Sequence, residues 1–269
     1  MLKKIDFGYI APVDYLHMIP KTTKFHLILA HLLNNKKYVD FYNGEFDRGC
    51  YIILDNSAFE FKRPIEIDEI LRLIDKSGIK VSCMVMPDYP NQPASKTLKS
   101  AEKSIAIVKS ESRQYDIMVV PQSSRGDHWQ WLNCYNEFLT WQEVKYIGMS
   151  ILGIPNAFCS LTGTDSISFN RIFATSIIKQ QNKCSDKKHH YLGMDEPREL
   201  IQQRALGLMD SNDSSSPVWH GILGIPYDSS VGGLKLGKSK VAVDFYTPII
   251  EDNRHIISNN IQIVEGWLK

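Results

Sequence analysis

Short apolar runs alternate with longer amphipathic stretches along most of this sequence, and this alternation restricts the possible fold more than any other feature. The apolar runs, each typical of a buried strand, lie at residues 25–30, 51–54, 81–86, 117–120, 146–149, 190–192 and 208–210. Helical spacing of apolar residues is found between most of them, at residues 67–76, 95–109, 128–141, 168–181 and 196–206. Strand and helix in repeated succession predict βα units around a parallel sheet. The pattern therefore favours an α/β barrel over a sandwich.

The length of the chain agrees with a barrel of this kind. A chain of 269 residues falls in the size range of a TIM-type (β/α)8 barrel, so we expect one domain over residues 1–269. The pattern leaves open which strands close the ring. Residues 7–11 are either a first strand or a loop, and residues 241–246 are a candidate for the closing strand. We expect a final helix at 256–268 and surface loops at 181–188 and 228–240.

Net charge, cysteine content and hydropathy limit the classes of protein that this chain can belong to. The formal net charge is +1, which excludes the overall basic bias of many nucleic-acid binders but not a local basic patch. The five cysteines are scattered and odd in number, as expected for free thiols in a reducing compartment, and they form no CxxC pair. We therefore expect neither a structural metal nor another cofactor. The sequence has no signal peptide or membrane span, so we expect a cytoplasmic protein.

Polar side chains follow several of the predicted strands, at the end where barrel enzymes carry their catalytic groups. Asp55, Asp88 and Gln122 each come directly or almost directly after an apolar run, and Asp213 lies in the polar stretch after 208–210. Any one of these residues is as well explained by a helix cap or a turn. Three carboxylates and one carboxamide converging on one rim are typical of a catalytic or binding site.

These residue types fit more than one reaction. One carboxylate can attack a sugar carbon while a second carboxyl transfers protons, and an Asp with a Gln can bind the edge of a purine. Spacing alone does not separate glycosyl transfer from an aldol or isomerase reaction. An aldolase of the Schiff-base type is disfavoured because no Lys stands at a predicted strand end.

Short motifs in order between residues 54 and 221 resemble the tRNA-guanine transglycosylases, and more closely their phage and bacterial relatives that insert 7-deazaguanines into DNA. Residues 54–60, Leu-Asp-Asn-Ser-Ala-Phe-Glu, resemble the Asp-Ser-Gly-Gly-Phe-Gln segment of that family. Residues 120–122 resemble its Val-Gln-Gly strand end, and 191–194 with 197–200 resemble Tyr-Leu-Met-Gly and the following Pro-Glu-Asp-Leu. Residues 211–217 occupy the place of Phe-Asp-Cys and its downstream Pro.

The resemblance implies a (β/α)8 fold and specific roles for residues in these motifs. Asp213 would be the nucleophile at the anomeric carbon of a guanosine nucleotide, with Asp210 as its nearby rival, and Asp55 would be the acid/base group. Asp88 and Gln122 would bind the purine edge. The remaining residues implied on the substrate side are Phe59, Gly148, Met149, Gly193 and Met194, of which Gly148 and Met149 would offer backbone contacts.

The implied partners are DNA, with its guanosine flipped out or single-stranded, and a free 7-deazaguanine base such as the 7-cyano form. The tRNA enzymes carry a Cys-x-Cys-x-x-Cys zinc segment that has no counterpart here after Asp213, which disfavours tRNA as the substrate. A nucleic-acid-binding barrel without catalysis is the third alternative. Candidate nucleic-acid contacts are Lys235, Lys238, Lys240 and Trp219, although a solvated loop and core packing explain them as well.

Overall fold

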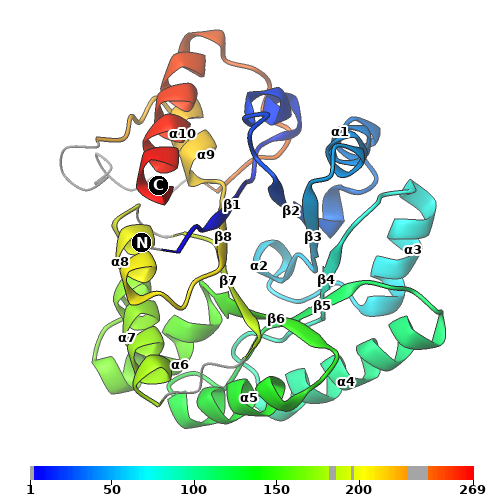
Figure 1. Cartoon of the computed structure of the whole chain (residues 1–269), viewed down its shortest axis with the longest axis vertical. Coiled ribbons are helices and arrows are strands. Elements are labelled where there is room, and N and C mark those ends of the chain that lie inside the picture. Colours follow the sequence, from blue (N-terminus) through cyan, green and yellow to red (C-terminus); the bar gives the residue numbers. More distant parts are fainter. Residues whose placement is uncertain (1–2, 182–185, 195–196, 229–241) are drawn as a thin grey trace.

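A computed structural model describes residues 3–181, 186–194, 197–228 and 242–269, and it forms a TIM-type (β/α)8 barrel (Figure 1). Eight parallel strands are hydrogen-bonded in the order β1-β8-β7-β6-β5-β4-β3-β2. The expected fold class is confirmed. The strands are β1 (Asp6–Tyr9), β2 (Phe25–Leu29), β3 (Tyr51–Asp55), β4 (Cys83–Val85), β5 (Asp116–Val119), β6 (Val144–Ser150), β7 (Lys188–Leu192) and β8 (Ser211–Ser214).

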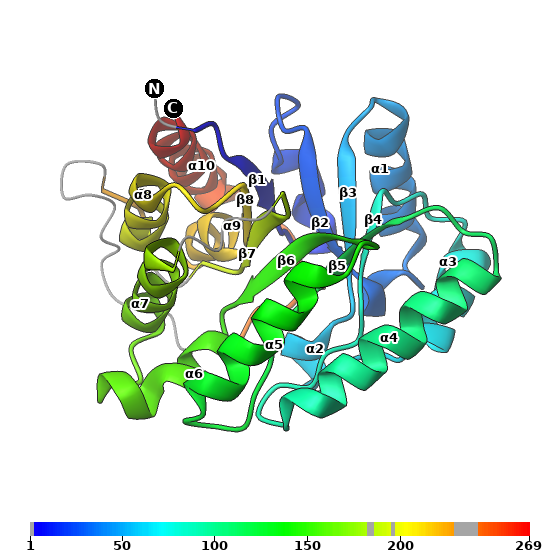
Figure 2. The same ribbon diagram turned by 60° about the horizontal axis from the view of Figure 1, so that its bottom comes forward.

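Helices surround the strands in Figure 1, and the view turned by 60° shows them along the outside of the barrel (Figure 2). Helix α2 is different, because it lies inside the ring of outer helices (Figure 1). The α-helices are α1 (Lys36–Asp47), α2 (Ala58–Phe61), α3 (Ile67–Ser77), α4 (Ala94–Ser110), α5 (His128–Thr140), α6 (Gly153–Thr162), α7 (Ile167–Gln180), α8 (Pro197–Leu206), α9 (Ser216–Ile222) and α10 (Arg254–Leu268). Short 3-10 helices are η1 (Val13–Met18), η2 (Ala30–Leu32) and η3 (Glu251–Asn253).

Six of the seven predicted strands overlap β2 to β7, and the expected last helix is α10. The seventh prediction is wrong, because residues 208–210 precede the strand and β8 consists of the polar sequence Ser211–Ser214. A polar strand is stable here because its side chains find partners. The Asn212 amide donates to the carbonyl of Tyr191 at 2.6 Å, and Ser211 Oγ lies 2.8 Å from Nδ1 of His190. All four residues of β8 are buried.

Strand β1 settles which segments complete the ring. It pairs with β8 through its whole length, from Asp6 opposite Ser211 to Tyr9 opposite Ser214. Its other neighbour is β2, and Gly8 faces that strand so closely that a Cβ would lie 3.2 Å from the backbone nitrogen of Leu27. Residues 7–11 therefore supply a strand. The alternative at 241–246 is wrong for its described part, because residues 242–246 contain no strand.

The core consists of the interior of the barrel and the layer between strands and helices. Its largest fully buried side chains include Trp131, Tyr135 and Phe138 of α5. The cysteines of the described part are free thiols, whereas Cys184 lies outside it. Within the described ranges, no helix combines the length and the apolar character needed to cross a membrane. The loop predicted at 228–240 lies almost wholly outside the described residues, as does the middle of the loop at 181–188.

Candidate active site

A cavity of about 610 Å³ opens at the carboxyl end of the barrel strands. Its polar wall carries Asp55, Glu60, Asp88 and Asp213, and its apolar wall includes Leu29, Ile151, Leu192 and Phe245. This is where the sequence placed the functional site. A second, more open groove of about 880 Å³ lies on the outside of the barrel between α4 and α5, away from the strand ends. The first cavity falls in the size range of small-molecule sites and is the candidate active site.

Asp213 lies in the middle of the polar strand β8 and is held through one of its two oxygens. Its Oδ1 accepts a hydrogen bond from the backbone N–H of Gly193 at 3.1 Å and lies 3.0 Å from Nε2 of His190. Among the described residues no hydrogen bond reaches Oδ2. The side chain is almost fully buried and lines the cavity. A carboxylate with one fixed and one available oxygen is suited to nucleophilic attack.

Asp55, at the end of β3, is a carboxyl group that holds its proton strongly. Its Oδ2 accepts from the backbone N–H of Ser57 at 2.7 Å. Burial raises the pKa of Asp55 well above its usual value, and the nearby charges of Glu60, Asp88 and Asp213 raise it further. Burial also raises the pKa of Glu60, and the nearby charge of Asp213 raises it further. A carboxyl with a raised pKa beside an available carboxylate is the combination needed for an acid and a nucleophile.

The raised pKa of Asp55 predicts how stability depends on pH. The folded state binds a proton at Asp55 that the unfolded chain releases, so this residue favours folding at low pH and loses that contribution as pH rises. Relative to Asp55→Asn, the wild type should lose about 1.4 kcal/mol of unfolding free energy per pH unit between the unfolded and folded pKa values. Urea titrations of both proteins from pH 4.5 upward test this. The exposed Asp40→Asn variant is the control, and parallel curves for wild type and Asp55→Asn would contradict the expected pKa.

Asp88 follows β4 and is held between two side-chain amides. Its Oδ1 accepts from Asn56 at 2.7 Å, and its Oδ2 accepts from Gln122 at 2.6 Å. Burial raises the pKa of Asp88 to about 6, while these two hydrogen bonds lower it. Asp88 is therefore mostly ionised at neutral pH. A carboxylate offers about four acceptor positions, so the two amides do not use all of them and a donor of a ligand can still bind.

Gln122 does not line the cavity. It is fully buried and lies against Gly153, because a Cβ added to Gly153 would be 2.5 Å from Oε1 of Gln122. Its role in this arrangement is to hold Asp88 in place.

Gly148 and Met149 also lie outside the cavity lining. A Cβ on Gly148 would be 2.8 Å from Val120 in the barrel interior, and the Met149 carbonyl accepts from Arg171 at 3.0 Å.

The other expected substrate contacts divide into three groups. Phe59, Gly193 and Met194 line the cavity, and Phe59 is 51% exposed. Trp219 is packed in the hydrophobic core, 6% exposed, which does not fit the expected stacking on a nucleic acid. The last group lies outside the described residues and consists of Lys235, Lys238 and Lys240.

Asp210, the rival nucleophile, lies at the opposite end of the barrel from the cavity. It precedes β8, where its carboxylate is 2.6 Å from Nζ of Lys3 and accepts from the backbone N–H of His189 at 2.8 Å. The two Asp residues are thus separated along β8, and only Asp213 lines the cavity. This placement favours Asp213 as the reactive group.

The structure adds residues that sequence reasoning did not select. One of them is His190, which contacts Asp213 directly. Asn56 and Glu60 stand inside the motif at 54–60, whose resemblance could have indicated them. No local signal marks His190, because its partner lies on another strand.

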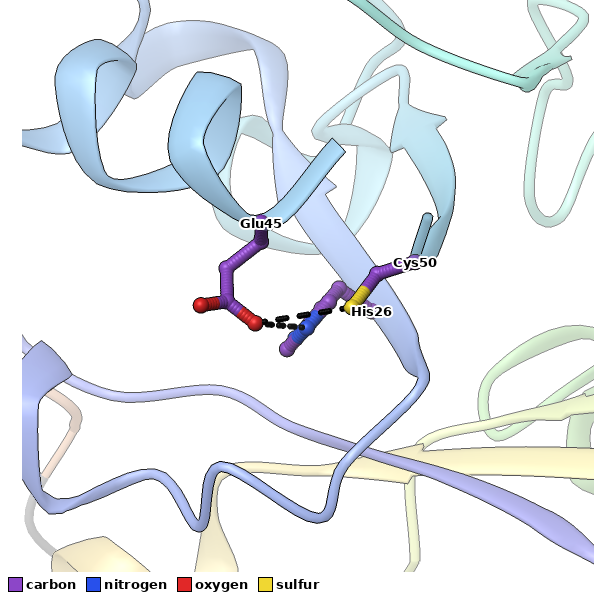
Figure 3. Close-up of side chains that lie close together, drawn as sticks. All are labelled: His26, Glu45 and Cys50. Carbon is purple, nitrogen blue, oxygen red and sulfur yellow. Dashed lines mark hydrogen bonds and ion pairs between the residues drawn. The ribbon is translucent and has the colours of Figure 1, made fainter. Parts of the chain in front are cut away.

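A different cluster, at the amino-terminal end of the barrel strands, brings together His26, Glu45 and Cys50 (Figure 3). Nε2 of His26 and Sγ of Cys50 lie 3.2 and 3.5 Å from Oε2 of Glu45, and the donor atoms of all three lie within 4.8 Å of one another. The same Glu45 oxygen is paired with Arg48. Burial raises the pKa of Cys50 and lowers that of His26 to about 4. Because the Arg48 guanidinium already pairs with Glu45, this cluster is better suited to hydrogen bonding than to binding a metal.

We therefore expect purified protein to carry much less than one zinc per chain. Arg48 would have to leave Glu45, and Cys50 would have to lose its proton, before three ligands could bind the ion. Elemental analysis of protein purified without chelators measures the zinc content. Tightly held zinc that is lost in Cys50→Ala but kept in the control Cys159→Ala would overturn this expectation and identify the cluster as the site.

Comparison with known proteins does not assign this site. No protein-family model matches the chain. No curated protein matches it.

Proposed function

We propose that this protein is a DNA guanine transglycosylase, which exchanges guanine in DNA for a 7-deazaguanine such as 7-cyano-7-deazaguanine. One observation carries the proposal: Asp213, held through Oδ1, shares a cavity with Asp55, whose pKa is raised. This is the pair of groups that a double displacement at a sugar carbon requires. The motif resemblance gives the substrate class.

In the first step, Oδ2 of Asp213 attacks C1′ of the deoxyguanosine. The bond from C1′ to N9 breaks, its electron pair leaves with guanine, and Asp55 gives its proton to the departing base. In the second step the 7-deazaguanine loses its N9 proton to Asp55 and attacks C1′, which releases Asp213. Two inversions leave the configuration of the sugar unchanged.

The remaining cavity residues support binding of a purine. Asp88 has acceptor positions left for the adjacent N–H groups of guanine, and the exposed ring of Phe59 offers a stacking surface at the cavity wall. A paired guanosine cannot reach a cavity at the end of a barrel, so the nucleotide must be flipped or single-stranded.

The decisive experiment supplies purified protein with 7-cyano-7-deazaguanine and either guanosine-containing single-stranded DNA or unmodified tRNA. Mass spectrometry of the digested nucleosides then detects exchange. Modified deoxyguanosine in DNA, with tRNA unchanged, supports the proposal. Modification of tRNA alone would establish the tRNA reaction, and no exchange in either would favour a barrel that binds nucleic acid without catalysis.

Removing the carboxylate that binds the purine should weaken base recognition. Asp88→Ala should lower kcat/KM for exchange by the equivalent of about 1–3 kcal/mol, because donors of the bound base lose their acceptor. Gln122→Ala should weaken recognition too, since Asp88 loses one of its two supports. The control Asp47→Ala removes a carboxylate from an exposed pair with Lys80. Normal exchange by both Asp88→Ala and Gln122→Ala would show that Asp88 and Gln122 only shape the turn.

A further inference from the structure

We infer that His190 is a positioning residue for the nucleophile: it fixes Oδ1 of Asp213 so that Oδ2 faces the sugar. This inference rests on the proposed function and adds a residue to it. His190 lies on β7 and is fully buried, so it touches Asp213 without lining the cavity. It acts through Asp213 alone.

The arrangement follows from the register of two strands. His190 pairs with Ser211 in the ladder between β7 and β8, which brings the imidazole beside the polar side chains of β8. Its Nδ1 lies 2.8 Å from Oγ of Ser211, and its Nε2 lies 3.0 Å from Oδ1 of Asp213. Both ring nitrogens are therefore engaged within the barrel.

The chemistry of the partners fixes the proton on the ring. A carboxylate can only accept, so Nε2 of His190 must carry the hydrogen that points to Asp213. Ser211 can donate to Nδ1, which favours this tautomer. Gly193 adds a second donor to the same carboxylate oxygen.

The two hydrogen bonds persist through the reaction. When Oδ2 of Asp213 forms the ester with C1′, Oδ1 becomes the carbonyl oxygen, which still accepts from His190 and Gly193. The carboxyl group is thus held in one orientation in both displacement steps. Holding reacting atoms in an attack geometry is a large part of catalysis, and small displacements are costly.

The matched control lies next to His190 in the sequence. His189 points to the other side of β7, where its Nε2 is 2.8 Å from the hydroxyl of Tyr135. It is also a buried histidine, and burial lowers its pKa to about 4. His189→Leu therefore removes a comparable buried side chain without touching Asp213.

The test compares three variants in the base-exchange assay with single-stranded DNA. His190→Leu should reduce kcat by about 100-fold and leave KM for DNA and base unchanged, because only the attacking group is misplaced. His190→Gln, whose amide can donate from nearly the position of Nε2, should recover most of the rate. His189→Leu should keep the wild-type kcat. Wild-type kcat in His190→Leu, or equal losses in His190→Leu and His190→Gln, would overturn the inference.

A second measurement needs no turnover. In protein with ¹⁵N-labelled histidine, the His190 resonances, identified by their loss in His190→Gln, should show a proton on Nε2. A bare Nε2 would overturn the inference whatever the activity. If the wild type exchanges no base, the proposed function is overturned. The role of His190 in positioning a nucleophile is then overturned as well.

Discussion

Asp213→Asn is expected to abolish base exchange, with a loss of rate on the order of 10⁴-fold or more, as for removal of other attacking groups. The amide lacks the charge and nucleophilicity needed to form an ester with C1′. The fold should persist, because the amide oxygen can still accept from Gly193 and His190. The loss would then reflect chemistry and not unfolding.

Denaturing electrophoresis of protein with labelled guanosine-containing DNA tests this directly. The wild type should give a covalent protein–DNA band, and Asp213→Asn should give none. Asp210→Asn is the matched control, since Asp210 lies at the other end of the barrel, and it should keep the band. Asp55→Asn should keep part of the first-step reaction, because water can replace a proton donor more readily than an attacking atom. A band that survives in Asp213→Asn but is lost in Asp210→Asn would move the nucleophile to Asp210.

Arg171→Met should produce the largest loss of stability, about 3–5 kcal/mol of unfolding free energy. Arg171 of α7 is fully buried, and its guanidinium donates to the carbonyls of Gly193 at 2.9 Å and Met149 at 3.0 Å. Its Nε lies 3.2 Å from a carboxylate oxygen of Glu199, as an ion pair that is not aligned for a hydrogen bond at that atom. The substitution takes the cationic partner from a buried carboxylate and one donor from each carbonyl.

Urea denaturation measures the loss. Arg125→Met is the control, because Arg125 forms an exposed pair with Asp165 that should contribute at most about 1 kcal/mol. The double variant Arg171→Met/Glu199→Met should be more stable than Arg171→Met. The single variant leaves the Glu199 carboxylate buried without its Arg171 partner, whereas the double variant removes that carboxylate as well. Equal stability of Arg171→Met and wild type would show that the ion pair contributes nothing net.

The periodicity of apolar residues did not predict helices α6 and α1, because their sequences depart from the usual helix signals. Helix α6 begins with Gly153 and has Pro155 in its first turn, which is a pattern typical of a loop. A Pro in the first turn costs little, because the N–H groups there have no partner within the helix. Helix α1 was also not predicted, although Asn35 caps it by accepting from the backbone N–H of Tyr38. Its polar face and Gly44 weaken the apolar period.

The sequence by itself determined the fold class and the end of the barrel where the candidate site lies. Alternating apolar and amphipathic segments specify βα units, and parallel strands bring their carboxyl ends to one rim, so Asp55 and Asp88 could be placed there from their positions after apolar runs. These properties depend on local periodicity and on a general rule of topology.

Only the tertiary structure decided the surroundings of Asp213. Its strand is polar and gave no apolar signal, and its side chains are instead hydrogen-bonded to the side chain of His190 and the carbonyl of Tyr191 on β7. The contact with His190 depends on the register between the two strands. Since side chains alternate between the two faces of a strand, a shift of one residue would turn His190 outward and His189 inward. That register depends on how the strands pair within the barrel, and no segment of the sequence specifies it alone.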